Sequence, residues 1–119
     1  MKVVPLRLQP GDDLRLALET WMGEQQEQAG CVISAVGSLS VAQLRLAGAA
    51  EATTIHGELE ILSLSGTLSA NGGHLCSGSL VRTTAELVLG LLQQQWRFWR
   101  ELDPGTGYAE LRISPRSAG

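Results

Sequence analysis

The chain is 119 residues long, 44% apolar and 18% charged, with a formal net charge of −3. This length and composition fit one globular domain and argue against an intrinsically disordered chain. A negative net charge also disfavours nonspecific DNA binding, which depends on clustered Lys and Arg residues that neutralise phosphates. We therefore expect a single domain over residues 1–119, with a frayed tail at residues 114–119.

Two features of the chain bear on its cellular compartment. The two cysteines, Cys31 and Cys76, lie far apart and do not suggest a disulfide framework. Residues 1–7 lack the apolar run of a secretory signal peptide, and no apolar stretch reaches the length of a membrane span. These features predict a cytoplasmic protein with reduced cysteines and no membrane partner.

The N-terminal part predicts a strand followed by a helix. Residues 3–8 alternate apolar and polar side chains, and Pro5 favours the edge of a sheet. Asp12 or Asp13 can then cap a helix by accepting hydrogen bonds from its first turn. The expected apolar face of this helix consists of Leu14, Leu18, Trp21 and Met22. Gly30 is expected to end the helix.

The middle of the chain predicts a series of strands. Residues 31–39 are apolar and rich in β-branched side chains, which indicates a buried strand that ends in a turn at Gly37-Ser38. Residues 42–47 alternate and predict a second strand, followed by a loop. Residues 55–68 show a period of two in their second half and predict one strand or a bent pair.

Residues 80–92 support two interpretations. Thr83 and Glu86 match a capping box ahead of an apolar run, which favours a helix. The alternation of apolar residues, the β-branched content and Gly90 favour a strand, which is the interpretation we adopt. The chain should then end in a hairpin, with strands at residues 97–102 and 108–113.

Five short segments form a combined pattern that is more specific than any one of them. They are Gly37-Ser38-Leu39, Leu59-Glu60-Ile61-Leu62-Ser63-Leu64-Ser65-Gly66-Thr67, Gly72-Gly73-His74-Leu75, Val81-Arg82-Thr83-Thr84-Ala85-Glu86-Leu87 and Arg100-Glu101-Leu102-Asp103-Pro104-Gly105-Thr106-Gly107-Tyr108-Ala109-Glu110-Leu111. In this order the segments resemble the PPC domain family (plants and prokaryotes conserved domain), in its bare prokaryotic form. The resemblance covers nearly the whole chain.

The resemblance implies an α+β fold, with a mainly antiparallel β-sheet packed by one main helix, and assembly as a homotrimer. In plants the domain follows AT-hook motifs, which hold the DNA, while the domain itself mediates protein association. Prokaryotic members are often labelled as DNA-binding by transfer from plants, and no general enzymatic activity is established for them. Some members look like metal binders that use His residues near the trimer interface.

The chain departs from the family pattern in two ways. It contains no Arg-Gly-Arg core of an AT-hook, so the DNA-binding label has no support in this sequence. The family usually carries a His-Leu-His strand and a turn ahead of its Gly-Gly-His-Leu motif, whereas residues 67–72 here lead almost directly into that motif. A deletion at this point would remove most ligands of the family's metal site.

His74 and Cys76 are the candidate metal ligands. A spacing of two residues in a strand places both side chains on one face, where both could contact one zinc ion. Two ligands do not complete a site, so neighbouring subunits would have to supply the others. The alternative, which we favour, is a structural histidine and a small buried thiol.

Six further residues are candidates for an interaction surface or a pocket: Gly37, Ser38, Glu60, Arg82, Glu86 and Tyr108. The two glutamates lie on otherwise apolar strands, where a buried carboxylate could act as an acid or a base. Pairing with an arginine such as Arg82 or Arg100 at a subunit contact is the alternative that we favour. No serine lies in a nucleophile elbow, and two histidines are too few for an obvious catalytic triad.

The sequence therefore predicts a non-enzymatic, homotrimeric PPC-type module that binds another protein or a small ligand. The alternative is a zinc-binding protein or a metal-dependent enzyme with sites between subunits, centred on His74. Direct binding of nucleic acid is the least favoured of the three hypotheses.

Overall fold

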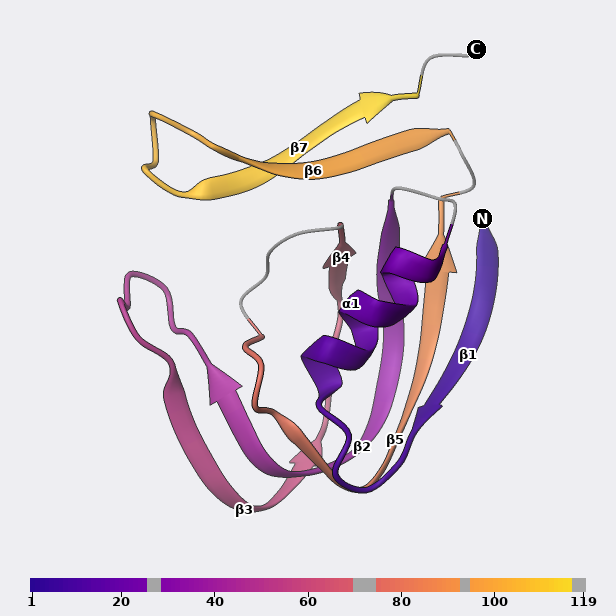
Figure 1. The fold of residues 1–119 in the computed structure, drawn as a ribbon, viewed down its shortest axis with the longest axis vertical. Helices are drawn as coiled ribbons and strands as arrows, with labels where there is room; N and C mark the ends of the chain where they lie inside the picture. The colour runs from indigo at the N-terminus through magenta and orange to yellow at the C-terminus, as the bar shows by residue number, and fades with distance from the viewer. Residues whose placement is uncertain (26–28, 70–74, 93–94, 117–119) are drawn as a thin grey trace.

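The computed structural model describes residues 1–25, 29–69, 75–92 and 95–116. It consists of a bent antiparallel sheet, one helix and a separate two-stranded hairpin (Figure 1), which confirms the predicted α+β class. The elements in chain order are β1 (Lys2–Leu8), α1 (Leu14–Glu24), β2 (Gly30–Leu44), β3 (Thr53–Ile61), β4 (Gly66–Leu68), β5 (Leu80–Leu91), β6 (Trp96–Leu102) and β7 (Ala109–Pro115).

The main sheet has the strand order β1-β5-β2-β3, and β4 pairs with the first residues of β2. Every neighbouring pair is antiparallel. β4 lies beside Gly30 to Val32 of β2, while β3 lies beside the later part of the same strand. The region at residues 55–68 therefore contains a bent pair, which is one of the two predicted arrangements.

β2 is one continuous strand of 15 residues where two strands were predicted. The predicted turn at Gly37-Ser38 is wrong, because β2 passes through this dipeptide and the sheet accommodates it with register shifts against β5. A Cβ atom added to Gly37 would overlap the carbonyl oxygen of Thr84 and lie 2.7 Å from the Cα of Ala85. The glycine therefore permits a close approach of two backbones inside the sheet.

β5 confirms the strand that was predicted for residues 80–92. Its buried apolar residues include Val81, Ala85, Leu87 and Leu89. Thr83 lies midway between Val81 and Ala85 in this alternation but is exposed. Gly37 of β2 pairs with Ala85 and Leu39 pairs with Val81, so β5 has two extra residues in this interval. This bulge turns Thr83 away from the core.

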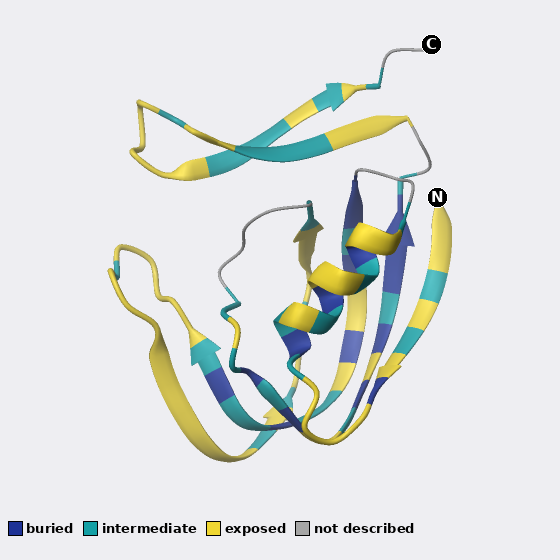
Figure 2. Ribbon diagram, viewed as in Figure 1, coloured by how far each residue is buried: buried dark blue, intermediate teal, exposed yellow. Residues whose placement is uncertain are grey.

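α1 covers one face of the main sheet (Figure 1). Asp13 is its N-cap, and its Oδ1 accepts the backbone N–H of Leu16 at 3.1 Å. Leu14 and Leu18 pack into a core with residues of β2 and β5, and Figure 2 shows the buried positions gathered between these elements. No helix within the described ranges is long and apolar enough to cross a membrane.

The end of α1 differs from the prediction. The helix ends at Glu24, with Gln25 as its C-cap, whereas Gly30 was expected to stop it. Gly30 is instead the first residue of β2, and a Cβ added there would lie 3.0 Å from the carbonyl oxygen of Gly90 in β5. The glycine permits close strand contact rather than a helix stop.

β6 and β7 form the hairpin that was predicted at the C-terminal end, and they constitute a sheet of their own (Figure 1). The turn is closed by Asp103, whose N–H donates to the carbonyl of Tyr108 at 2.8 Å and whose Oδ1 accepts the N–H of Gly105 at 2.7 Å. Arg112 lies 3.3 Å from Glu101 and 3.6 Å from Asp103, so ion pairs join the two strands.

The substitution Gly37→Ala should lower the free energy of unfolding by about 2–3 kcal/mol, because the added methyl group forces β2 and β5 apart. Gly23→Ala is the matched control. Gly23 is exposed in α1 with open space around its Cα, so alanine should raise the free energy of unfolding by about 0.5–1 kcal/mol. Urea denaturation at one protein concentration measures both, and an unchanged stability of Gly37→Ala would contradict the close strand contact.

Candidate functional site

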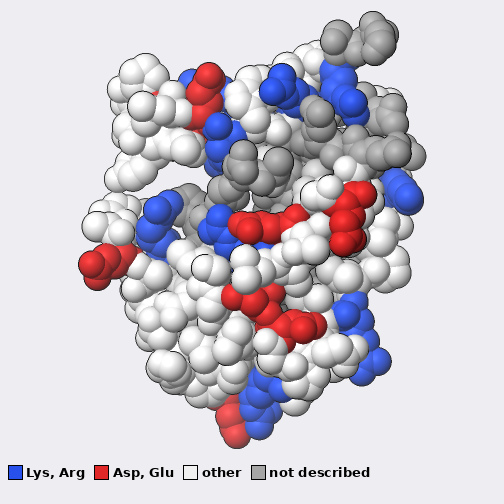
Figure 3. Space-filling view, in the orientation of Figure 1, with Lys and Arg blue, Asp and Glu red and all other residues white. Residues whose placement is uncertain are grey.

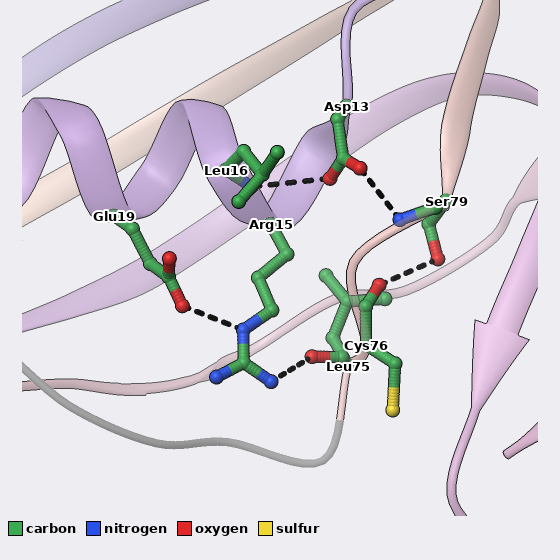
Figure 4. A network of polar contacts seen from close by, with 8 residues as sticks. Asp13, Arg15, Leu16, Glu19, Leu75, Cys76 and Ser79 are labelled. Carbon is green, nitrogen blue, oxygen red and sulfur yellow. Dashed lines mark hydrogen bonds and ion pairs between the residues drawn. The ribbon is translucent and has the colours of Figure 1, made fainter.

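Asp13 ties the N-terminus of α1 to the segment that leads into β5 (Figure 4). Its Oδ1 caps the helix, while its Oδ2 accepts the backbone N–H of Gly78 at 2.5 Å. The N–H of Leu14 donates to the carbonyl of Ser79 at 2.9 Å, directly beside this contact. One carboxylate therefore fixes two elements that are 65 residues apart in sequence.

Ser79 and Cys76 extend the network toward β2. The Ser79 side chain is fully buried, donates to the carbonyl of Cys76 at 3.1 Å and accepts the N–H of Gln43 at 2.9 Å. The N–H of Cys76 donates to the carbonyl of Gln43 at 3.0 Å. Cys76 is thus held by backbone contacts in a half-buried position, with its sulfur directed away from Asp13 (Figure 4).

The predicted metal pair is placed only in part, since His74 lies outside the described residues. Within residues 1–25, 29–69, 75–92 and 95–116, no group of three or more His, Cys, Asp and Glu side chains could hold a metal ion. Cys76 therefore belongs to no such group within these ranges.

Five of the other predicted residues lie on the three neighbouring strands β5, β2 and β3 of the main sheet. Ser38 lies opposite Glu60 of β3 in the strand register, and its hydroxyl lies 2.8 Å from that of Thr83 in β5. Arg82 forms an ion pair with Glu58 at 3.1 Å, and not with Glu60 or Glu86. Gly37 and Glu86 lie in the same region through the pairing of β2 with β5.

The two glutamates are not buried within the single chain. Glu60 and Glu86 were considered as buried carboxylates, but both are exposed in the single chain. Their strands are apolar on the face that α1 covers, whereas these two positions alternate out of that face. Tyr108 lies apart from this group, in the turn directly before β7, with 56% of its surface exposed.

The face of the main sheet opposite α1, here called the outer face, carries an uncovered group of apolar side chains beside the exposed Glu86, which lies opposite Val36 in the strand register. The apolar members are Met1, Val3, Cys31, Ile33, Val36 and Val88, and those in β1, β2 and β5 alternate with core positions. Val36 is 65% exposed and Val3 is 55% exposed. A Cβ added to Gly90 would meet Met1, Cys31 and Ile33 within 3.3 Å, so these side chains gather over one point of the sheet.

Two adjoining cavities lie on the other side of the molecule, between α1, the end of β2 and the hairpin. The larger is about 580 Å³ and the smaller about 410 Å³. Both are lined by Arg15, Arg45 and Arg100, while Tyr108 lines only the smaller. Figure 3 shows this side hollowed between the hairpin and the body below it, with basic side chains at the rim.

The arginine cluster was not predicted from the sequence. Arg15 belongs to α1, Arg45 follows β2 and Arg100 belongs to β6, so the fold alone brings them to one place. No local motif marks Arg15 or Arg45, and Arg100 was noted only as the first residue of one family segment and as a possible partner for a glutamate. The cluster can therefore be recognised only from the tertiary structure.

The first 72 residues match the family model of the Plants and Prokaryotes Conserved (PCC) domain. The chain belongs to this family. The match confirms the resemblance that the sequence motifs carried. The loss of the family's His-Leu-His strand and turn before Gly73 stays a prediction, since residues 70–74 lie outside the described residues.

Among curated proteins, the chain is similar to the bifunctional protein GlmU of Synechococcus sp. strain JA-3-3Ab, with 46% identity over 129 aligned positions. The alignment covers 95% of this chain and 21% of that protein, so the chain spans about a fifth of the relative's length. Because 129 positions exceed the 119 residues of the chain, the relative carries residues that have no counterpart here.

Three solved structures share the fold. A hypothetical protein from Salmonella enterica is 34% identical, with a TM-score of 0.89 over 98% of this chain and 95% of that one. A proposed DNA-binding protein from Bacteroides thetaiotaomicron is 18% identical, with a TM-score of 0.78 over 92% and 91%. A metal-containing protein from Archaeoglobus fulgidus is 28% identical, with a TM-score of 0.65 over 92% of each chain.

Asp13→Ala should lower the free energy of unfolding by about 2 kcal/mol, because it removes the helix cap and leaves the N–H of Gly78 without an acceptor. Asp12→Ala should lower it by less than about 1 kcal/mol, since Asp12 is exposed and its carboxylate accepts only the N–H of Gln9. Equal effects of the two substitutions in thermal or urea denaturation would contradict the role of Asp13.

Proposed function

We propose that the chain assembles as a homotrimer and acts as a non-enzymatic module that binds another protein or a small ligand. The outer face of the main sheet carries this proposal, because its group of apolar side chains is uncovered in the single chain. A contiguous exposed apolar surface is typical of a protein-association site. Identical subunits usually assemble with closed symmetry, which a trimer satisfies.

β3 supports the same assembly. It lies at the edge of the sheet, pairs only with β2, and is exposed along most of its length, including Ile55 at 41%. The unpaired backbone N–H and C=O groups of an open edge strand can pair with strands of other chains. A neighbouring subunit that covers β3 and the outer face would remove both exposed surfaces.

The chemistry of the polar residues supports a binding role over a catalytic one. The hydroxyls of Ser38 and Thr83 contact each other at 2.8 Å, and no His, Asp or Glu in the described part of the chain forms a hydrogen bond with either. A hydroxyl needs an adjacent base to become a nucleophile. The family resemblance supports a trimer, and the two cysteines, neither of which forms a disulfide in the described structure, support a cytoplasmic setting.

Light scattering of the purified chain should give a mass of about three times 12.7 kDa. Val36→Lys should shift the protein toward monomers, because an ammonium group would enter the apolar contact. Leu16→Lys is the control, since Leu16 is also exposed but lies on α1, away from the outer face. A monomeric wild-type protein, or a Val36→Lys trimer as stable as the control, would overturn the assembly.

Zinc binding is the second candidate function. One comparison favours it, namely the similarity to the metal-containing protein of Archaeoglobus fulgidus. His74 and Cys76 would contribute from each subunit, as the sequence suggested, and other subunits would supply the remaining ligands.

Metal analysis of purified protein separates the two candidates. The binding-module proposal predicts far less than one zinc per chain after dialysis against a weak chelator. Stoichiometric zinc that is lost in both His74→Ala and Cys76→Ser, but kept in Cys31→Ser, would replace the leading proposal with the second candidate. Cys31 serves as the control because it is a free cysteine on the outer face.

A further inference from the structure

We infer that the two adjoining cavities bind a small amphipathic anion, with its acidic head group at Arg15, Arg45 and Arg100 and its apolar part in the larger cavity. This inference rests on the proposed role as a binding module and names the chemical class of the ligand. The cavity of about 580 Å³ falls within the range of roughly 300–1,000 Å³ that small-molecule sites occupy.

The first argument is the concentration of positive charge. Three of the nine Lys and Arg residues line both cavities, in a chain whose net charge is −3. Among the described residues that line the larger cavity, one carries a carboxylate, namely Glu19, which pairs with Arg15 at 2.7 Å. Arg45 and Arg100 form no hydrogen bond or ion pair with any side chain that the structure describes. Their charges are therefore available to a ligand.

The second argument is the Nε atom of Arg100. This atom is buried and has no hydrogen-bond partner among the residues described. A buried N–H group without an acceptor destabilises a protein, and a charged one more so than a neutral one. A carboxylate or phosphate bound at the same guanidinium group would offset its charge, which no described side chain pairs with, because planar guanidinium groups bind both kinds of anion.

The third argument is the contrast between the walls of the two cavities. The larger cavity is walled mainly by aliphatic side chains from three parts of the fold: Leu18, Met22, Val32, Leu44, Leu64 and Leu68. The smaller cavity is lined by Tyr108 and by Glu110, whose carboxylate would repel an anion. The acidic group of a ligand therefore belongs at the shared arginines, with its apolar part directed toward the aliphatic walls.

Arg15 has a different role in this arrangement from the other two arginines. Its Nη1 donates to the carbonyl of Leu75 at 2.9 Å, and its Nε pairs with Glu19. These contacts hold the guanidinium group in place on α1 (Figure 4). Arg15 therefore fixes one wall of the head-group site, whereas Arg45 and Arg100 are the residues that a ligand would engage directly.

Isothermal titration of the wild-type protein with hexanoate, octanoate and decanoate, each below its micelle concentration, tests the ligand class. Each added methylene should tighten binding about three- to fourfold until the aliphatic cavity is filled. Decanol should bind at least about tenfold more weakly than decanoate, because it cannot satisfy the arginines. Monodecyl phosphate, run beside decanoate, identifies whether a phosphate or a carboxylate is the preferred head group.

Substitutions locate the site. Arg100→Gln and Arg45→Gln should each weaken decanoate binding by about tenfold or more. Arg45 is exposed and unpaired within the described structure, so its replacement leaves the fold intact even if Arg100→Gln does not. Arg97→Gln is the control, because Arg97 lies on the same strand as Arg100 but lines neither cavity. Ser65→Trp should abolish binding by filling the larger cavity.

Three results would overturn the inference: no saturable binding of any anion, decanol binding as tight as that of decanoate, or an Arg45→Gln protein that binds like the Arg97→Gln control. The mass of each sample, measured by light scattering, separates failure of the ligand inference from failure of the proposed assembly. A trimer that binds none of these anions would refute the ligand class alone. A monomer that binds decanoate through Arg45 would refute the trimer alone.

Discussion

The arrangement of the molecule depends on the carboxylate of Asp13. One oxygen caps α1 and the other holds the N–H of Gly78, while backbone hydrogen bonds join Leu14 to Ser79 and Val81 to Asp12 beside it. The start of the helix and the start of β5 are therefore fixed to each other. Since β5 lies at the centre of the sheet, this contact sets where α1 lies on the core and where Arg15 meets the cavity wall.

The chain has one helix in its described part and a sheet with two faces, and the proposed function follows from this imbalance. α1 buries Leu87 and Leu89 on one side but leaves Val36 and Val3 uncovered on the other. A second layer has to come from outside the chain if the apolar surface is to be buried. The hairpin does not provide it, because β6 and β7 pair with each other and contribute Arg100 to the cavities beside α1.

The sequence predicted the parts of the fold that depend on local pattern. The alternation along β5 and a helix cap at Asp12 or Asp13 each have a short-range cause, so both were predicted, and the structure selects Asp13. Gly37 was misinterpreted because a glycine that permits close strand contact has the same local signal as a glycine in a turn. The arginine cluster was missed because its members are far apart in sequence, and Glu60 was misplaced because its exposure depends on which face α1 covers.

The hairpin has a thermodynamic consequence for any ligand of the cavities. It carries Arg100 and Tyr108, yet it forms no strand pairing with the main sheet. A molecule held between Arg100 and the aliphatic walls would bridge two independently hydrogen-bonded sheets. Binding and hairpin docking would then be linked equilibria, so that occupancy would slow amide exchange in β6 and β7 more than in the central strands.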